Sequence, residues 1–568
     1  MTGDEYRDFI INNPKATEAM ITAVNLYPGV NTDWQDEVMR TAVSTEHNIS
    51  AYGSVKDYLP YRVSFGYTNQ NGILKTSNFE RYTGSVSLTP KFFDDHLNMN
   101  LNAKGIYIKN QFADTGAVVG AVSFDPTKPV KNDNNKFGGY FTWTTDNDPN
   151  GTKASSAGVN PVSLLEMTDD QSKVKSFIGN AQFDYKIHFL PDLRLNLNVG
   201  MDYTKSDGDK YVDPSAPGSY GEDPLKSGSN YLYFYERRNT LLDFYAQYSK
   251  DFAKQHFDVM AGYSYQKIIN NDGIRGTNNY FTSDATGADN LSVGNGDKAI
   301  HFQNYPNKRQ FSIGIIFGRV NYGFDNRYLL TATLRRDGSS KFGKNNRYGY
   351  FPSFSLGWNV AEEKFMENVH WLDQLKLRGG YGVLGNQEID NYQYSSTITT
   401  GINYPDGNGG LLQGAFPKNF ANPDIKWEET AMTNVGIDFM AFNNRLSLTA
   451  DYYVKNTKDI LLTVPIPISS GGANDPIRNA GKIRNNGFEF NLGWMDQPNP
   501  DISYGINFIG SFNKNKVIAM GSESGSIKGG STNQNITTSE TKAGYPIGGY
   551  WLISTAGYFN SREEVNAY

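Results

Sequence analysis

Leu193 to Thr204 alternates strictly between apolar and polar positions. Every odd residue from Leu193 to Tyr203 is apolar or aromatic, and every even residue from Arg194 to Thr204 is polar, charged or glycine. Because successive side chains of a β-strand point to opposite faces, the segment predicts a strand with one apolar and one polar surface. About ten tilted residues are enough for such a strand to cross a membrane. The odd side chains are therefore predicted to face lipid, and the even ones a polar interior.

The same alternation recurs in segments whose connections are short and long in turn. Short links are predicted at Phe92 to His96, Leu190-Pro191-Asp192, Asp251 to Gln255, Asp325-Asn326, Asn443-Asn444 and Pro498 to Asp501. Long links are predicted at Asn110 to Ser176, Lys205 to Arg238, Ile269 to Gln310, Asn386 to Glu429 and Val464 to Ile483. Outer-membrane barrels have short periplasmic turns and long external loops, whereas a soluble β-sandwich has no reason to alternate so regularly.

We therefore predict an all-β fold, a transmembrane antiparallel β-barrel with about sixteen strands between Asn48 and Val517. Alternation alone would suit the core of a β-sandwich equally well. Aromatic residues at strand ends favour the barrel, since an interfacial girdle needs them there, although ordinary cross-strand pairing would also explain them. These residues are Tyr61, Phe65, Tyr67, Tyr322, Phe324, Tyr328, Tyr452, Tyr453, Phe508 and Phe512.

The start of the chain breaks this rhythm. Tyr6, Phe9 and Ile10 have helical spacing, and Ala16 to Val24 shows no alternation. We predict a helical segment over residues 1–30 and a partial outer-membrane β-barrel with long extracellular loops over residues 31–568. Glu362 to Gln374 is predicted to form another short helical turn, at a periplasmic link.

Composition excludes several classes of protein. The mean hydropathy is -0.55, and no run approaches the roughly eighteen apolar residues of a membrane helix. The 53 Lys and Arg residues against 59 Asp and Glu residues give a net charge of -6 without a basic tract, so nothing favours nucleic-acid binding. The absence of Cys excludes disulfides and thiol chemistry. The residues after Met1 lack the basic and apolar regions of a secretory signal.

Eight segments along the chain form a recognisable set. They are Asn31 to Asp36, Phe317 to Tyr322, Arg327 to Gly343, Phe351 to Trp358, Leu375 to Gln387, Asn422 to Glu428, Tyr452 to Asp459 and Asn479 to Glu489. Together they resemble the SusC/RagA family of TonB-linked outer-membrane transporters over nearly the whole chain.

The resemblance implies TonB-dependent import of an oligosaccharide or oligopeptide in the outer membrane of a Gram-negative bacterium, without catalysis. It implies a SusD-like surface lipoprotein and the TonB-ExbB-ExbD complex as partners. Two alternatives are a TonB-dependent siderophore or vitamin receptor, and a secreted β-sandwich adhesin or glycan-binding protein. The family has a plug and a 22-stranded barrel. The sequence shows neither a plug before Asn31 nor an amphipathic terminal strand, so we expect a fragment that lacks the plug and the C-terminal strands.

Motifs for site chemistry are weak. Gly380, Gly382 and Gly385 fit G-x-G-x-x-G, but a polar loop follows instead of a helix. Asp146, Asp148, Asn150 and Gly151 match the opening of a calcium loop, but Ala157 stands where a bidentate Glu is required. The six His residues show no ligand spacing, and acidic pairs such as Asp94-Asp95 fall at predicted turns. We predict no catalytic, cofactor or metal site.

Tyrosines in the long loops could stack on sugar rings or grip a peptide, or could pack within their own loops. They are Tyr211, Tyr220, Tyr231, Tyr233, Tyr280, Tyr392, Tyr394 and Tyr404. The sequence does not single out a substrate-binding residue among them.

Overall fold

The computed structural model describes residues 1–132, 136–154, 156–220, 227–279, 305–466, 474–521, 525–531 and 536–568. The chain divides into two units. Unit 1 comprises Met1–Phe183, Asn198–Leu241 and Lys267–Gln310, and unit 2 comprises Asp184–Leu197, Leu242–Gln266 and Phe311–Tyr568. Within the described ranges, seventeen strands belong to one sheet. Among the described residues, no helix is both long and apolar enough to cross a membrane.

In unit 1, strands that follow one another in the chain pair antiparallel. They are β1 (Ser44–Val55), β2 (Leu59–Asn71), β3 (Asn78–Leu88) and β5 (Leu97–Phe112), with the two-residue β4 (Lys91–Phe92) beside β5. Five longer strands contribute residues to both units: β6 (Thr168–Ile187), β7 (Leu190–Val212), β8 (Ser229–Phe252), β9 (Gln255–Asn279) and β10 (Tyr305–Phe324).

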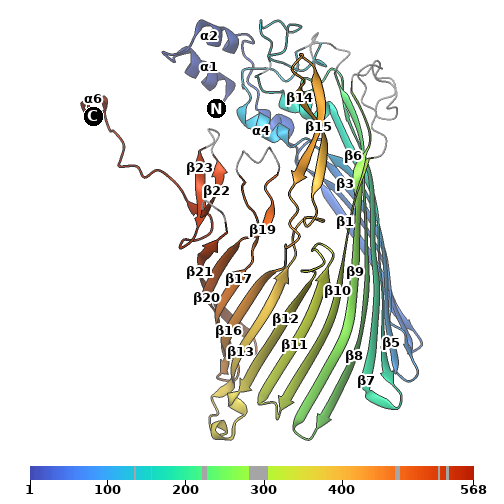
Figure 1. Ribbon diagram of the computed structural model, residues 1–568. Helices are drawn as coiled ribbons and strands as arrows, with labels where there is room; N and C mark the ends of the chain where they lie inside the picture. Colours follow the sequence, from blue (N-terminus) through green and yellow to red (C-terminus); the bar gives the residue numbers. More distant parts are fainter. Residues whose placement is uncertain are drawn as a thin grey trace. The chain divides into compact units, whose positions relative to one another are not determined.

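Unit 2 continues the same up-and-down topology (Figure 1). Each strand pairs antiparallel with the next in the series β10, β11 (Tyr328–Ser339), β12 (Tyr348–Asn359), β13 (Leu372–Asn386), β16 (Glu428–Ala441), β17 (Leu446–Lys458), β20 (Gly481–Asn499) and β21 (Ile502–Met520). Small sheets occupy two of the long connections: β14 (Thr397–Pro405) with β15 (Leu411–Asn419), and β18 (Leu461–Thr463) with β19 (Ile477–Asn479). A third, β22 (Ser526–Ser531) with β23 (Thr537–Lys542) and β24 (Gly549–Tyr550), follows β21. The all-β, antiparallel prediction is confirmed.

The short links are tight turns. Asp325 and Asn326 lie in the turn between Phe324 and Tyr328, and Asn443 and Asn444 in the turn between Ala441 and Leu446. All four have positive φ, a conformation that Asn and Asp tolerate. One predicted turn is misplaced, because β7 already begins at Leu190 and the turn lies at His188-Phe189. Proline is tolerated at the beginning of a strand, so Pro191 does not mark the turn.

Several long connections are shorter than predicted because the strands extend further. β7 runs to Val212 and β9 to Asn279, well beyond the predicted loop starts at Lys205 and Ile269. Backbone hydrogen bonds between strands do not depend on side-chain polarity, so the sheet continues where the apolar alternation has ended.

Helices lie at the start of the chain, within the connection between β5 and β6, between β12 and β13, and after β24. The predicted N-terminal helices are α1 (Gly3–Ile11), which begins with a capping box at Thr2 and Glu5, and α2 (Glu18–Val24). Further helices, which the sequence pattern did not predict, are α3 (Trp34–Val38), α4 (Gly116–Ser123), α5 (Pro161–Glu166) and α6 (Arg562–Ala567). The helical turn predicted at Glu362 to Gln374 is only partly right. The 3-10 helices η3 (Val360–Glu362) and η4 (Lys364–Met366) lie there, but β13 already begins at Leu372.

Two hydrophobic clusters lie under the long connections. The first, in unit 1, packs Trp34 and Val38 of α3 against residues of α4, α5 and the segment around Phe141. The second, in unit 2, contains Phe342, Phe351, Ile389, Ile425 and Trp427. These clusters anchor the connections to the ends of the strands.

The second cluster joins segments that the sequence singled out one by one. The Trp427 indole donates to the Arg347 carbonyl at 3.1 Å, and the Asn346 amide to the Asp424 carbonyl at 2.9 Å. The Asn479 amide donates to the carbonyls of Lys426 and Asp459. Motifs that are more than a hundred residues apart in the sequence thus pack together in one cluster under the long connections.

One face of each sheet segment is an apolar belt. In unit 1, Ile49, Val63, Phe65 and Val86 share a face and are exposed. In unit 2, aromatic rings gather where β13, β16 and β20 meet their short turns: Trp371 packs on Phe439 and Phe442, and Phe442 on Trp494. Phe324 and Tyr328 stack beside another short turn. This arrangement is typical of an interfacial girdle.

Candidate functional site

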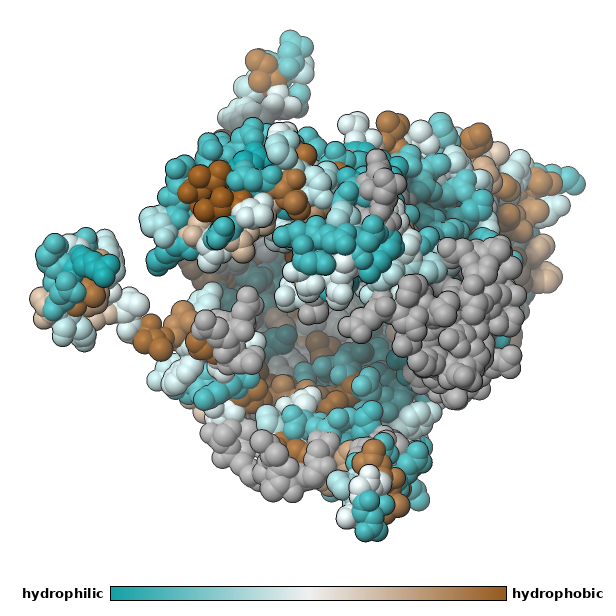
Figure 2. All heavy atoms as spheres, turned by 90° about the horizontal axis from the view of Figure 1, so that it is seen from above, coloured by the Kyte–Doolittle hydropathy of each residue, from teal (hydrophilic) through white to brown (hydrophobic). Residues whose placement is uncertain are grey.

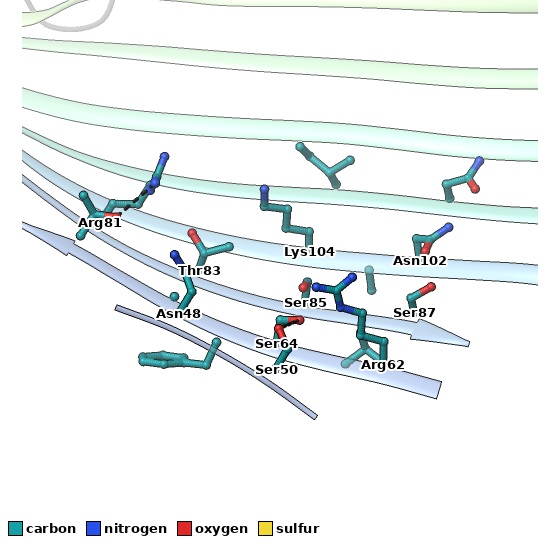
Figure 3. A pocket seen from close by; sticks show the side chains of 17 residues that line it. Asn48, Ser50, Arg62, Ser64, Arg81, Thr83, Ser85, Ser87, Asn102 and Lys104 are labelled. Carbon is teal, nitrogen blue, oxygen red and sulfur yellow. Dashed lines mark hydrogen bonds between the residues drawn. The ribbon is translucent and has the colours of Figure 1, made fainter. Parts of the chain in front are cut away.

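The opposite face of unit 1 is polar. Polar side chains project from one side of β1, β2, β3 and β5, and we call this set of side chains the polar wall (Figure 3). They line a hollow of about 660 Å³, which Asn180 of β6 also borders. The labelled members are Asn48, Ser50, Arg62, Ser64, Arg81, Thr83, Ser85, Ser87, Asn102 and Lys104.

Strand register explains why these groups gather. Ser50 lies opposite Ser64, Ser64 opposite Ser85, and Ser85 opposite Lys104, so one row crosses four strands. The Ser50 and Ser64 hydroxyls are hydrogen-bonded at 2.9 Å. The three serines of this row are each next in sequence to a residue of the apolar belt, Ile49, Val63, Phe65 or Val86, whose side chain points the other way. Sequence alternation therefore determines which side chains form the wall.

The polar wall carries excess positive charge. Arg81 donates to the Thr68 hydroxyl at 3.1 Å and lies 4.0 Å from the carboxylate of Glu46. Arg62 and Lys104 are exposed and have no ion-pair partner among the residues that the structure describes. The wall can therefore offer hydroxyl and amide groups to a hydrated solute, together with cations for a negative group.

The predicted strand around Leu193 is part of β7 and follows the expected parity. Asn180, which borders the hollow, donates to the Asn198 amide oxygen, and Ser176 and Thr204 share a hydrogen bond of 2.9 Å. The odd residues Val199 and Met201 are exposed on the other face. Asn198 and Thr204 of β7 thus lie on the polar face of unit 1, as the pattern predicted.

Unit 2 has a charged cluster that crosses three strands. Arg378 of β13 donates two hydrogen bonds of 2.6 Å to the Asp451 carboxylate on β17, and its Nε lies 3.1 Å from Asp438 on β16. Asn434 also donates to Asp451, at 3.0 Å. We call these four residues the Arg378 cluster. Arg378 and Asn434 border a hollow of about 300 Å³, so the cluster lies on a polar surface and holds neighbouring strands together.

Register requires Arg378 to reach over the intervening strand. Both Arg378 and Asp451 lie opposite Gly436 of β16. A Cβ atom at position 436 would lie 2.6 Å from Asp451 Oδ1 and 2.7 Å from Arg378 Cζ. The absence of a side chain there opens the path for the guanidinium group.

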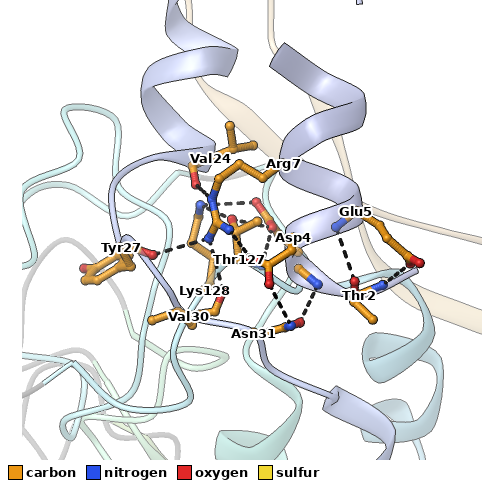
Figure 4. Close-up of polar contacts among 12 residues, drawn as sticks. Thr2, Asp4, Glu5, Arg7, Val24, Tyr27, Val30, Asn31, Thr127 and Lys128 are labelled. Atoms are coloured by element: carbon orange, nitrogen blue, oxygen red, sulfur yellow. Dashed lines mark hydrogen bonds and ion pairs between the residues drawn. The ribbon is translucent and has the colours of Figure 1, made fainter. Parts of the chain in front are cut away.

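The N-terminal helices are fastened to the segment after α4 (Figure 4). The buried Lys128 donates to the Ala23 carbonyl at 2.6 Å and to the Thr127 hydroxyl at 2.8 Å, and lies 3.3 Å from Asp125. Arg7 of α1 donates to the carbonyls of Val24 and Val30. Burial lowers the pKa of the Lys128 ammonium, and Asp125 opposes that shift. These contacts are structural and hold α1 and α2 in place.

Replacing Lys128 with Met is expected to loosen α2, because Ala23 loses its side-chain donor. The expected local cost is about 1–2 kcal/mol, equivalent to roughly tenfold faster amide exchange in α1 and α2. Hydrogen exchange with mass spectrometry measures it, and Lys15→Met, at an exposed position, is the control. Equal exchange rates in the two variants would show that Lys128 does not fasten the helices.

The weak motifs have structural explanations. Gly380, Gly382 and Gly385 all lie inside β13, so no phosphate-binding turn forms there. Asp146 and Asp148 accept backbone N–H groups of Asp148 and Asn150 in a turn. Across the described part of the chain, no group of three His, Asp or Glu side chains could hold a metal ion.

The loop tyrosines mostly contact their own surroundings. Tyr233 donates to Asp170 at 3.1 Å and its ring lies 5.8 Å from that of Tyr231. Tyr220 packs on Phe137, and Tyr392 on Tyr394. Tyr404 is exposed, and Tyr280 lies outside the described residues. Seen from above, the described surface is mainly hydrophilic with small separate hydrophobic groups (Figure 2). In the described part of the chain, these contacts do not single out one of the tyrosines as a substrate contact.

Comparison with known proteins agrees with this architecture. Residues 123–566 match the family model described as TonB dependent receptor-like, beta-barrel. The chain is 37% identical over 540 residues to the TonB-dependent receptor SusC of Bacteroides thetaiotaomicron, covering 92% of this chain and 51% of that protein. It is 29% identical to the TonB-dependent receptor P3 of Formosa agariphila, covering 86% of this chain and 47% of that protein.

Solved structures give the same fold. The RagAB peptide transporter matches with a TM-score of 0.78 and 23% identity, covering 96% of this chain and 61% of that one. The chain spans about half the length of the curated relatives that it matches.

Proposed function

The chain belongs to the SusC/RagA family of TonB-dependent outer-membrane receptors, and on this premise we propose that the protein imports an oligosaccharide or oligopeptide across the outer membrane. The polar wall is the observation that carries the proposal. A solute with many hydroxyl or amide groups loses hydration on entering a narrow path, and the Ser, Thr and Asn side chains around the hollow replace those hydrogen bonds.

No bond is made or broken in the proposed activity. The polar groups of the solute replace hydrogen bonds to water with hydrogen bonds to the polar wall and then release them. Each contact therefore has to be weak, and similar contacts have to follow one another along the path. Arg62 and Lys104 would favour solutes that carry a negative group. We propose no catalytic role for any residue.

The proposed partners are a SusD-like surface lipoprotein and the TonB-ExbB-ExbD complex. The match to a TonB-dependent receptor supports the TonB complex, and the likeness in fold to a peptide transporter agrees with the oligopeptide class. The SusD-like lipoprotein and the oligosaccharide class are proposed from the resemblance to the SusC/RagA family. The siderophore or vitamin receptor and the secreted adhesin are less well supported, because the 37% identity to SusC covers nearly the whole chain.

Uptake in cells tests this function. A deletion strain and its complemented parent would receive either fluorescent neutral oligosaccharides or fluorescent peptides, with and without an uncoupler of the proton gradient. Energy-dependent uptake of one probe class should require the gene. Equal uptake in both strains for both classes would contradict the proposal, as would recovery of the protein in the soluble medium. Uptake of a ferric siderophore alone would favour the alternative receptor.

A further inference from the structure

Four exposed cations gather on one face of β20 and β21, at the ends that lead to long connections. They are Lys482, Arg484, Lys514 and Lys516, which we call the basic patch. All have even numbers, and so do Phe488 and Phe512, which lie opposite each other on the same two strands. Because side chains of equal parity share a face, the basic patch lies directly beyond the apolar belt and not on the polar surface.

The patch brings like charges together. Arg484 lies directly opposite Lys516, and Lys514 lies opposite Asn486 on the next rung of that face. Directly opposite side chains have Cβ atoms about 5 Å apart, and like charges in this position are destabilising. An anion bound between the two cations would turn this repulsion into two attractive contacts.

The described residues supply no such anion. Arg484 donates to the Asn456 amide oxygen at 2.7 Å, and the structure records no ion pair for Lys482, Lys514 or Lys516 in the described part of the chain. Glu429 of β16 is the acidic side chain on this face nearest in register, and it is already paired with Lys458 at 2.8 Å. The positive charge of the basic patch is therefore not balanced by an acidic side chain among the described residues.

The depth of the basic patch in the membrane indicates which molecule could supply the negative charge. Trp494, on the same face of β20, belongs to the aromatic group at the short-turn end, and ten residues separate it from Arg484. Ten residues span about 33 Å along a strand and about 25 Å across a membrane at a tilt near 40°. An outer-membrane apolar belt is about 25 Å tall. Arg484 thus lies at the outer boundary of the belt, at the depth of lipid headgroups.

We propose that the basic patch binds the phosphate groups of an anionic glycolipid in the outer leaflet. A lipid fits better than a soluble anion, because the exposed rings of Phe488 and Phe512 lie immediately below the cations and can contact acyl chains. Arg and Lys are the side chains suited to phosphate oxygens. The inference requires membrane insertion but not import, so an uptake assay and a lipid-binding assay can fail separately.

The test variant is Arg484→Gln/Lys516→Gln, which removes both charges of the opposed pair. Both side chains are exposed, so the strands are expected to keep their fold. Lys455→Gln is the matched control, since Lys455 of β17 is exposed and lies opposite Asn485 at the same level, but on the other face. Phosphorylated glycolipid that remains bound after purification from outer membranes would be quantified per protein. The double variant should retain several-fold less lipid than the wild type, and the control should retain the same amount.

Thermal unfolding in neutral detergent distinguishes lipid from free phosphate. Without lipid, the double variant should be at least as stable as the wild type, because the repulsion is gone. Added purified lipid A should raise the unfolding temperature of the wild type and the control but not of the double variant. Equal lipid retention in all three proteins would overturn the proposal. Equal stabilisation by inorganic phosphate alone would also overturn it, because it would indicate a site for a soluble anion.

Discussion

Val63→Arg is expected to lower the free energy of unfolding by about 2–4 kcal/mol, whereas Ser64→Arg is expected to change it by less than about 1 kcal/mol. Val63 is exposed on the apolar belt, where it lies opposite Ala51 and Val86. An arginine there would have to lose hydration in hydrocarbon or distort the bilayer.

Ser64 is the neighbour on the other face and borders the hollow of about 660 Å³. An arginine there stays hydrated, and water screens its repulsion from Arg62. Urea unfolding in lipid vesicles, followed by the gel shift between folded and unfolded forms, measures both variants. Equal losses of unfolding free energy at the two positions would contradict the assignment of one face of β2 to lipid and the other to water.

Gly436→Ala is expected to cost about 2–3 kcal/mol, because the new methyl group occupies the path of Arg378 to Asp451. Hydrogen bonds between charged groups contribute more than this in a dry interior, but the side chains of Arg378 and Asp451 are 29% and 19% exposed, so water reduces the effect. Gly379→Ala is the control, since its Cβ would meet nothing closer than the Asn434 carbonyl at 3.9 Å.

A double-mutant cycle separates this effect from general strain in β16. In an Arg378→Gln background, the added methyl group obstructs a shorter, uncharged side chain, so Gly436→Ala should cost at least about 1 kcal/mol less than in the wild type. The same vesicle-based unfolding measures all four proteins. Additive costs would show that Gly436 does not serve the Arg378 cluster.

Period-two alternation predicted most of the sheet, because it records which side chains face each solvent. It identified the strand around Leu193 and the turns at Asp325 and Asn443. It failed where that signal is absent. The extended ends of β7 and β9 follow backbone hydrogen bonding, and α4 has small apolar residues on all sides without a polar face.

The tertiary features could not be predicted from one sequence. Arg378 and Asp451 are 73 residues apart in the chain, and only the register of three strands brings them together. Likewise, the polar wall required the register of β1, β2, β3 and β5. Alternation indicates the face of a residue but not its neighbour on the next strand. For the same reason, the opposition of Arg484 and Lys516 became visible only in the structure.

Odd residues of β7 are expected to face lipid, and even residues a water-filled interior. The chain has no Cys, so single Cys residues can be placed at each position from Leu197 to Asp202 without a background. Each would carry a fluorescent maleimide in the assembled outer-membrane protein, with a quencher attached to lipid chains. Quenching should be strong at 197, 199 and 201 and weak at 198, 200 and 202. Quenching without this alternation, or with the opposite parity, would contradict the account.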